Sequence, residues 1–170
     1  MTEELLKSDS ILDEIKNWEL AEKIIEVDEK QVKLVIFSLD HHVFAFLGTE
    51  VREILPADGI TWIPGATEFI PGVINIRGDI EAVIDLRQVL GFADTRKKQG
   101  FFIMAQANEQ SNAILVDSII DVLDVPVSTL NQPMINLDIK LSQLIMNQLE
   151  SNGKVVSILS VSRIVDQVVV

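Results

Sequence analysis

The chain has 170 residues, of which 48% are hydrophobic, enough for one domain or for two small subdomains that share a core. Its formal net charge of −12 argues against nucleic acid as a partner, because phosphates would be repelled, and leaves protein partners or small ligands. The absence of cysteine excludes disulfides and thiol chemistry, and suits a reducing cytoplasm.

The N-terminal segment, residues 5–26, has the periodicity of a helix. Its apolar side chains recur at three-to-four spacing on or near one face at Ile11, Ile15, Trp18 and Ile25. This spacing predicts an amphipathic helix from about residue 10 to residue 26. We expect the helix to pack on its own domain; the alternative is a helix that docks on another protein. The opening letters MTEELLKSDS lack a basic region followed by an apolar core, so no secretory signal is predicted.

From Val32 onward the hydrophobic period changes to two, which is typical of half-buried strands. The stretch VKLVIFSLDHHVFAF predicts two strands joined at residues 40–42, and VREIL follows. After a loop rich in proline and glycine come GVINIRG and DIEAVIDL, whose Gly78-Asp79 junction suits a tight turn. None of these apolar runs approaches the roughly 20 residues of a membrane-spanning helix, so we expect no direct membrane insertion.

The second half of the chain continues the pattern. RQVLGF predicts one helical turn, and FFIMAQANEQSNAILV predicts a hairpin that turns within Asn108–Asn112. Residues 137–149 are ambiguous, because their leucines recur at helical spacing while Asn152-Gly153 is a strong hairpin signal. Since the strand Val155–Leu159 needs a partner, we expect a strand over about 143–149. Short strands with frequent turns predict an all-β barrel or sandwich.

Few residues could support catalysis or metal binding. His41 and His42 are the only histidines, and neighbours in a strand point to opposite faces, so they rarely bind one metal together. Asp117, Asp121 and Asp124 have the spacing of a carboxylate cluster, although a solvated face has the same spacing. No phosphate-binding loop, Ser-His-Asp set or HExxH motif occurs. We therefore expect no catalytic residue, no metal and no cofactor.

Arg77-Gly78-Asp79 places a cation between two apolar strands. The tripeptide is that of cell-adhesion ligands, but nothing in the sequence predicts secretion, so we do not expect adhesion. An arginine that emerges from a β core needs a carboxylate, and its planar fork can bind both oxygens.

The blocks VREI, GVINIRG, VIDLR and ILVDSIIDVL, in this order, resemble the CheW family of bacterial chemotaxis adaptors over about residues 32–166. The resemblance implies two intertwined five-stranded, SH3-like β-barrels, preceded by an N-terminal helix and linker over residues 1–31. The first barrel would comprise about 32–94 plus the C-terminal segment, and the second about 97–158. Most of the N-terminal helix lies outside the resemblance.

The resemblance also implies a non-catalytic adaptor that is cytoplasmic and associated with membrane-bound receptor arrays. Its partners would be the cytoplasmic tip of a methyl-accepting chemoreceptor and the regulatory domain of a CheA-type histidine kinase, which would dock on the second barrel. Six residues would line or support the receptor-binding groove, carried over position by position: Val51, Glu53, Ile54, Gly72, Asn75 and Arg77. Within this set, Arg77 would form a partly buried ion pair with Glu53 that fixes how two segments sit together.

Two other functions stay open. The first is an adaptor of the same fold in a different chemosensory pathway, such as one that controls pilus or surface motility, with the N-terminal helix as its distinguishing feature. The second is a β-barrel protein that binds a small molecule.

Overall fold

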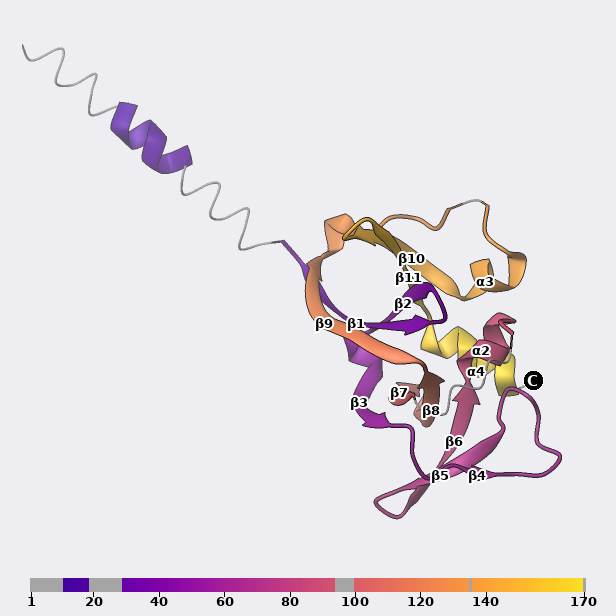
Figure 1. Ribbon diagram of the computed structural model, residues 1–170. Coiled ribbons are helices and arrows are strands. Elements are labelled where there is room, and N and C mark those ends of the chain that lie inside the picture. The colour runs from indigo at the N-terminus through magenta and orange to yellow at the C-terminus, as the bar shows by residue number, and fades with distance from the viewer. Residues whose placement is uncertain (1–10, 19–28, 94–99, 135, 170) are drawn as a thin grey trace, which may run out of the picture.

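The computed structural model describes residues 11–18, 29–93, 100–134 and 136–169, and strands dominate this part of the chain. They form two sheets (Figure 1). The first sheet contains β1 (Gln31–Leu39), β2 (His42–Leu47), β9 (Ser118–Pro126), β10 (Ile145–Ser151) and β11 (Lys154–Leu159). The second contains β3 (Val51–Pro56), β4 (Thr61–Trp62), β5 (Gly72–Ile76), β6 (Asp79–Asp85), β7 (Phe101–Ala107) and β8 (Gln110–Val116). The predicted all-β fold class is confirmed.

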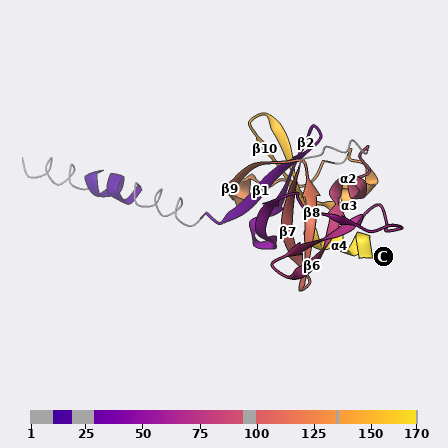
Figure 2. The same cartoon turned by 60° about the horizontal axis from the view of Figure 1, so that its bottom comes forward.

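Short helices connect or follow these strands. They are η1 (Gly48–Glu50), α2 (Leu86–Leu90), η2 (Val127–Thr129), α3 (Ile139–Leu144) and α4 (Val161–Val169). Figures 1 and 2 both show α2, α3 and α4 gathered on one side of the strands. Helix α2 is the predicted single turn: the Asp85 side chain accepts a hydrogen bond from the Arg87 N–H at its start, and Gly91 ends it with a φ of 75°.

Three hairpins close with two-residue turns in which both residues have positive φ, the geometry that matches the twist of the strands. These turns are Arg77-Gly78, Asn108-Glu109 and Asn152-Gly153. The turn between β5 and β6 therefore lies one residue earlier than the expected Gly78-Asp79 junction, because Asp79 already pairs with Ile76.

The two sheets divide the chain differently from the expected barrel ranges. The first sheet, in the order β10-β11-β2-β1-β9, takes strands from both ends of the sequence, and the second, in the order β3-β7-β8-β6-β5-β4, takes the middle. Residues 97–158 therefore contribute strands to both sheets. The reason is that β11 runs parallel to β2, with Val156 opposite Val43, so the last hairpin completes the sheet that the first hairpin begins.

The ambiguous segment before the last turn contains both a helix and a strand. Helix α3 ends at Leu144 and β10 begins at Ile145, so the expected strand over 143–149 begins two residues too early. The helical spacing of the leucines corresponds to α3, and the Asn152-Gly153 hairpin signal corresponds to β10 and β11, which follow it. Strand β10 pairs antiparallel with β11, as the final strand required.

Three clusters of buried side chains form the core. One lies within the first sheet and draws on all five of its strands: Leu34, Ile36, Ala45, Val125, Leu149, Val156 and Ile158. A second lies within the second sheet: Ile74, Val83, Phe102, Met104 and Ala113. The third and largest, here called the shared core, joins side chains of both sheets to α2 and α4, among them Phe37, Phe46, Leu86, Ile103, Ile114 and Ile164. Each sheet thus curls around its own core, as two barrels require, and the shared core joins them.

Residues 11–18 form a helix, and all eight are exposed. The exposed side chains include Ile11, Leu12, Ile15 and Trp18, the last with 77% of its surface accessible. The expectation that the helix packs on its own domain is therefore wrong for these residues, because periodicity predicts a helix but not what covers its apolar face. The rest of the expected range, residues 19–26, lies outside the described part of the chain.

Candidate functional site

An ion pair joins the two ends of the second sheet. Arg77, in the turn between β5 and β6, donates hydrogen bonds from Nη1 and Nη2 to Oε1 and Oε2 of Glu53 on β3, each 2.9 Å long. Strand β3 stands at one end of the strand order, while β5 is next to last at the other. The planar fork of arginine matches the two carboxylate oxygens, so the pair links β3 to the hairpin near the other end of the strand order.

The turn that carries Arg77 is built for glycine and asparagine rather than for a long side chain. Arg77 has a φ of 55° and Gly78 a φ of 96°, and the left-handed region is unfavourable for residues with a Cβ. Asn75 supports the turn, because its Oδ1 accepts the Gly78 N–H at 2.9 Å. Because asparagine or glycine would adopt this backbone conformation more easily, an arginine at this position indicates that its side chain has a function.

The pair is exposed on the side of Arg77 and partly buried on the side of Glu53. The side chain of Arg77 is 74% exposed and that of Glu53 is 29% exposed. The hydrogen bonds and the charge of Glu53 raise the pKa of Arg77, so the guanidinium stays charged. Exposed pairs contribute little to stability. Two of the five N–H donors of the guanidinium contact Glu53, which leaves three for other partners.

Val51 and Ile54 lie on β3 on either side of this pair. Both are half-buried and pack against the shared core. The pairing of β3 with β7 shifts register between Val51 and Glu53, which makes Arg52 the extra residue of a β-bulge, and Arg52 is exposed. Bulges re-aim side chains and often occur beside functional sites. Arg52 is not predicted as a site residue, because a bulge leaves no clear mark on the alternation of polar and apolar residues.

Gly72 is buried and does not reach the surface. A Cβ on this residue would lie 2.4 Å from the backbone oxygen of Thr61, so Gly72 allows β4 to approach β5. The structure thus brings Glu53, Asn75 and Arg77 together where β3 meets the hairpin of β5 and β6, with Val51 and Ile54 on the same strand as Glu53. We call Val51, Glu53, Ile54, Asn75 and Arg77 the β3–β5 surface, which the buried Gly72 supports from within the sheet.

The substitution Gly72→Ala is expected to lower the free energy of unfolding by about 1–3 kcal/mol, because the added methyl group must push back a backbone carbonyl. Urea denaturation measures the loss. Hydrogen exchange should also show faster opening of the β4 pairing, which holds Trp62 opposite Gly72. An unchanged unfolding midpoint would show that β4 can move away at no cost.

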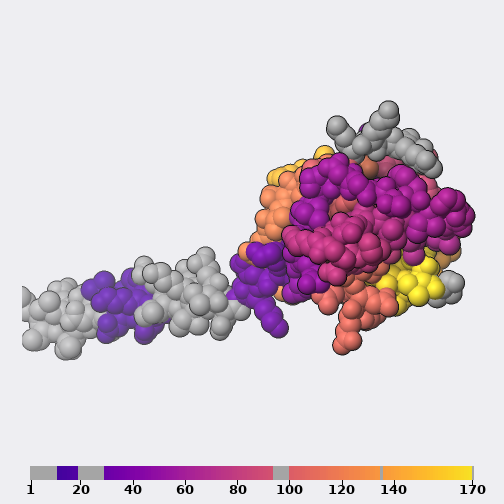
Figure 3. Space-filling model, turned by 90° about the horizontal axis from the view of Figure 1, so that it is seen from below, coloured from indigo at the N-terminus to yellow at the C-terminus, as the bar shows by residue number. Residues whose placement is uncertain are grey.

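Large apolar side chains are exposed near the β3–β5 surface. Ile80, opposite Asn75 in the hairpin, is 64% exposed, and Trp62 on β4 is 56% exposed. Figure 3 looks onto this end of the molecule, where the purple and magenta segments from β3 to β6 cover most of the visible face of the barrels. Exposed apolar side chains beside a fixed cation are typical of a protein-binding surface. Neither residue is predicted as part of the site, because strand alternation does not show which face of a sheet stays uncovered.

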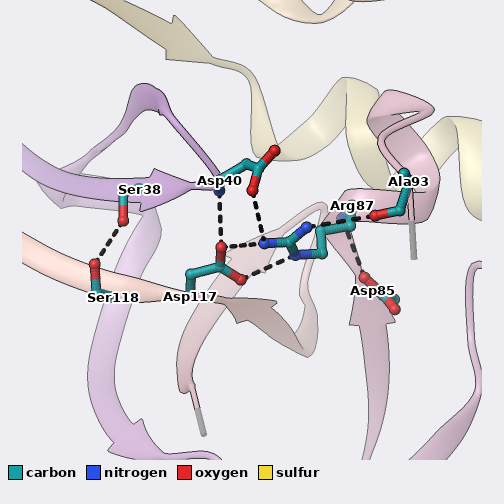
Figure 4. A network of polar contacts seen from close by, with 7 residues as sticks. All are labelled: Ser38, Asp40, Asp85, Arg87, Ala93, Asp117 and Ser118. Carbon is teal, nitrogen blue, oxygen red and sulfur yellow. Dashed lines mark hydrogen bonds and ion pairs between the residues drawn. The ribbon is translucent and has the colours of Figure 1, made fainter. Parts of the chain in front are cut away.

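A second polar network surrounds Arg87, whose exposed fraction is only 8% (Figure 4). Its Nε donates to Oδ1 of Asp117 at 2.9 Å, and its Nη2 donates to Oδ2 of the same carboxylate. The carboxylate of Asp40 lies 3.9 Å from Nη2. Asp117 is therefore part of a buried network, and not of a solvated face with Asp121 and Asp124, which are exposed.

Comparison with known proteins shows the family to which this chain belongs. The model of the family described as "CheW-like domain" matches residues 33–169. The chain belongs to the CheW-like family. The "Chemotaxis protein CheW" of Thermotoga maritima is 25% identical over 141 residues, which cover 83% of this chain and 92% of that protein. The protein of the same name from Bacillus subtilis is 36% identical over 62 residues, covering 36% of this chain and 40% of that protein.

A solved CheW structure has the same fold. The scaffolding protein TtCheW from Thermoanaerobacter tengcongensis superposes with a TM-score of 0.71 at 25% identity, covering 79% of this chain and 88% of that one. Membership in the CheW-like family makes the chain a non-catalytic chemotaxis adaptor. In the part of the chain that the structure describes, no helix has the length and apolar character needed to cross a bilayer.

The CheW-like domain also contains a carboxyl group that is costly to ionise. The side chain of Glu50, in η1, accepts a hydrogen bond from the backbone of Val161 at the start of α4, and its burial raises the pKa above the ordinary value of 4.5. Within the described residues its Oε2 is buried without a hydrogen-bond partner. Because the folded state holds this proton more tightly than the unfolded state, the contribution of Glu50 to stability falls as the pH rises above 4.5.

The substitution Glu50→Gln is expected to raise the melting temperature at pH 7 by about 2 °C, because glutamine keeps an acceptor oxygen and carries no charge to desolvate. The difference from the parent protein should shrink as the pH approaches 4.5. The control is Glu109→Gln, which removes one charge from the exposed turn between β7 and β8. A melting-temperature difference that does not depend on pH would contradict this role of the carboxyl group.

Proposed function

We propose that this adaptor couples a methyl-accepting chemoreceptor to a CheA-type histidine kinase, and that the β3–β5 surface contacts the cytoplasmic tip of the receptor. The proposal rests on the bidentate pair of Arg77 with Glu53, which holds a charged guanidinium at the surface. Exposed apolar side chains at Ile80 and Trp62 lie on the neighbouring strands. A helical tip could place apolar residues against them, as in helix-in-groove recognition.

The kinase regulatory domain would bind elsewhere, within residues 97–158. Strand β9 of the first sheet supports this position, because it is the edge strand of that sheet and carries Ile120 and Val122 exposed. Its register with β1 shifts between Ile36 and Phe37, which leaves Ile120 as the bulged residue. Edge strands with exposed apolar side chains are ready to bind another chain. The two partners would then occupy different sheets of one adaptor, in the cytoplasm and at receptor arrays.

Direct binding tests the proposal. The purified full chain is immobilised, and the receptor signalling tip and the kinase regulatory domain from the same organism are passed over it separately and together. We expect each to bind alone, and both to bind at once. The variant Ile120→Asp should weaken kinase binding and leave receptor binding intact. Binding of neither partner would refute the proposal, and thermal stabilisation by small molecules alone would instead favour a ligand-binding barrel.

An adaptor role in a different chemosensory pathway is favoured by one observation, the exposed helix over residues 11–18, which precedes the matched family domain. Its uncovered apolar face could bind a partner that other CheW-like adaptors do not have. The genomic neighbourhood, with flagellar or pilus genes, separates the two pathways.

Deletion of residues 1–26 is expected to change the melting temperature by about 2 °C or less, because the helix over residues 11–18 buries no side chain. Differential scanning calorimetry of the truncated and full chains measures this. A loss of several degrees would show that the segment packs on the barrels. If the truncated adaptor melts normally and loses one partner, the segment is a docking element.

A further inference from the structure

The chain passes between the two sheets at Asp117 without a loop. Strand β8 of the second sheet ends at Val116, and β9 of the first sheet begins at Ser118. One nearly continuous strand therefore belongs to both sheets, and Asp117 stands where it changes from one to the other. The backbone at this residue is therefore one of the places where the two sheets are joined, beside η1 between β2 and β3 and the shared core.

Asp117 is bonded to both sheets at this point (Figure 4). On the side of the first sheet, its carboxylate accepts a hydrogen bond from the backbone N–H of Asp40 at 2.8 Å. Its own backbone N–H donates to the backbone carbonyl oxygen of Ser38 at 3.2 Å. On the side of the second sheet, both of its carboxylate oxygens accept hydrogen bonds from Arg87 in α2, directly after β6. Ser38 and Ser118 add a contact of 2.5 Å between their hydroxyl groups.

The chemistry of the network favours a role in geometry. Arg87 is almost fully buried and faces the carboxylates of Asp40 and Asp117, while its backbone N–H binds the carboxylate of Asp85 at 3.1 Å. Apolar side chains of similar size often stabilise a protein as well as a buried ion pair does, and the best-attested use of buried ions is to fix one arrangement among several. A bidentate pair restrains both the distance and the relative angle of the two groups that it joins.

We propose that Arg87 and Asp117 are positioning residues that fix the angle between the two sheets. They would thereby hold the β3–β5 surface and the exposed face of β9 in one relative orientation. The restraint on the angle is inferred from the contacts of Arg87 and Asp117 alone. The consequence for coupling rests on the proposed function, in which a receptor and a kinase bind these two surfaces. The adaptor would act as a spacer of fixed shape.

Spin labels measure the angle without any partner. The chain contains no cysteine, so Asp79→Cys in the second sheet and Lys154→Cys in the first place two labels at exposed positions and nowhere else. Pulsed electron resonance then gives the distribution of distances between them. In the parent protein we expect one narrow distribution. Arg87→Lys keeps the charge but loses the fork, and should broaden the distribution.

The matched control is Lys33→Met, which removes an exposed ion pair with Asp124 inside the first sheet and should leave the distribution narrow. If Arg87→Lys does not fold, Asp117→Asn replaces it, because asparagine has the same shape and keeps one acceptor oxygen. If either Arg87→Lys or Asp117→Asn folds and gives the same distribution of label distances as the parent protein, the proposal is overturned.

A binding arm then addresses coupling. In Arg87→Lys, the receptor tip and the kinase regulatory domain should each bind as to the parent, while assembly of all three components weakens. If neither partner binds the parent protein, the proposed function fails, and the resonance data still decide the angle. If both partners bind the parent but the labels show no broadening in the variant, the positioning role fails and the adaptor function stands.

Discussion

Replacement of Arg87 by methionine is expected to lower the free energy of unfolding by about 3 kcal/mol, because removing one partner of a buried pair leaves the other charge uncompensated. The remaining charge is the carboxylate of Asp117, whose side chain is only 12% exposed. Methionine has a similar length, so lost packing contributes little. Urea denaturation measures the change, and an unaltered m-value would show that the unfolding transition still exposes the same surface.

Two further variants separate charge from packing. Lys33→Met breaks the exposed pair with Asp124 and should cost less than about 1 kcal/mol. The double replacement Arg87→Met with Asp117→Leu removes both buried charges, and should recover a large part of the loss. If Arg87→Met is as stable as the parent, or if the double variant is less stable than the single one, the pair does not act as a buried ion pair.

Under the proposed function, charge reversal at the β3–β5 surface is expected to reduce receptor affinity by about tenfold or more, because arginine is among the residues that most often contribute the binding energy of an interface. In Arg77→Glu the new carboxylate faces Glu53, so the bidentate contact is replaced by repulsion. The double swap Arg77→Glu with Glu53→Arg should recover part of the affinity. Surface plasmon resonance against the receptor tip provides the double-mutant cycle, and independent charges would give additive losses.

Arg77→Asn separates the role of the side chain from that of the turn. Asparagine prefers the positive φ that Arg77 adopts, so the hairpin should form at least as well as in the parent, while the guanidinium is gone. We expect an unchanged or higher melting temperature together with weaker receptor binding. Kinase binding should be unaffected. Full receptor affinity in this variant would show that the arginine only connects β3 to the hairpin.

Strand alternation and turn residues predict most of the local structure, because both depend on a few neighbouring side chains. The hairpin at Asn152-Gly153 and the helical turn at RQVLGF are examples. Alternation does not predict which strands share a sheet, since pairing between β11 and β2 is decided by burial over the whole chain. Alternation alone therefore does not determine how the chain is divided between the two sheets.

The candidate site was predictable only in part, for related reasons. The family blocks VREI and GVINIRG identify Glu53 and Arg77 as candidates, but the exposure of these two side chains depends on how the sheet curls. The spacing of Asp117 from Asp121 and Asp124 matches one face of a helix, but Asp121 and Asp124 lie on the strand β9. In a strand this spacing has no meaning, and the partner of Asp117 is Arg87, 30 positions away in sequence. No local pattern connects two such residues.

The parallel pairing of β11 with β2 sets an order of events during synthesis. Strand β2 leaves the ribosome early, yet the neighbour on its outer side is among the last strands to be made. Until then β2 exposes an unpaired edge, which is a hazard for aggregation during slow, non-local folding. The second sheet can form from the middle of the chain while the first waits. A nascent chain that stalls before β11 would thus carry a complete second sheet and an incomplete first sheet, without the α4 side chains of the shared core, and would be a substrate for chaperones.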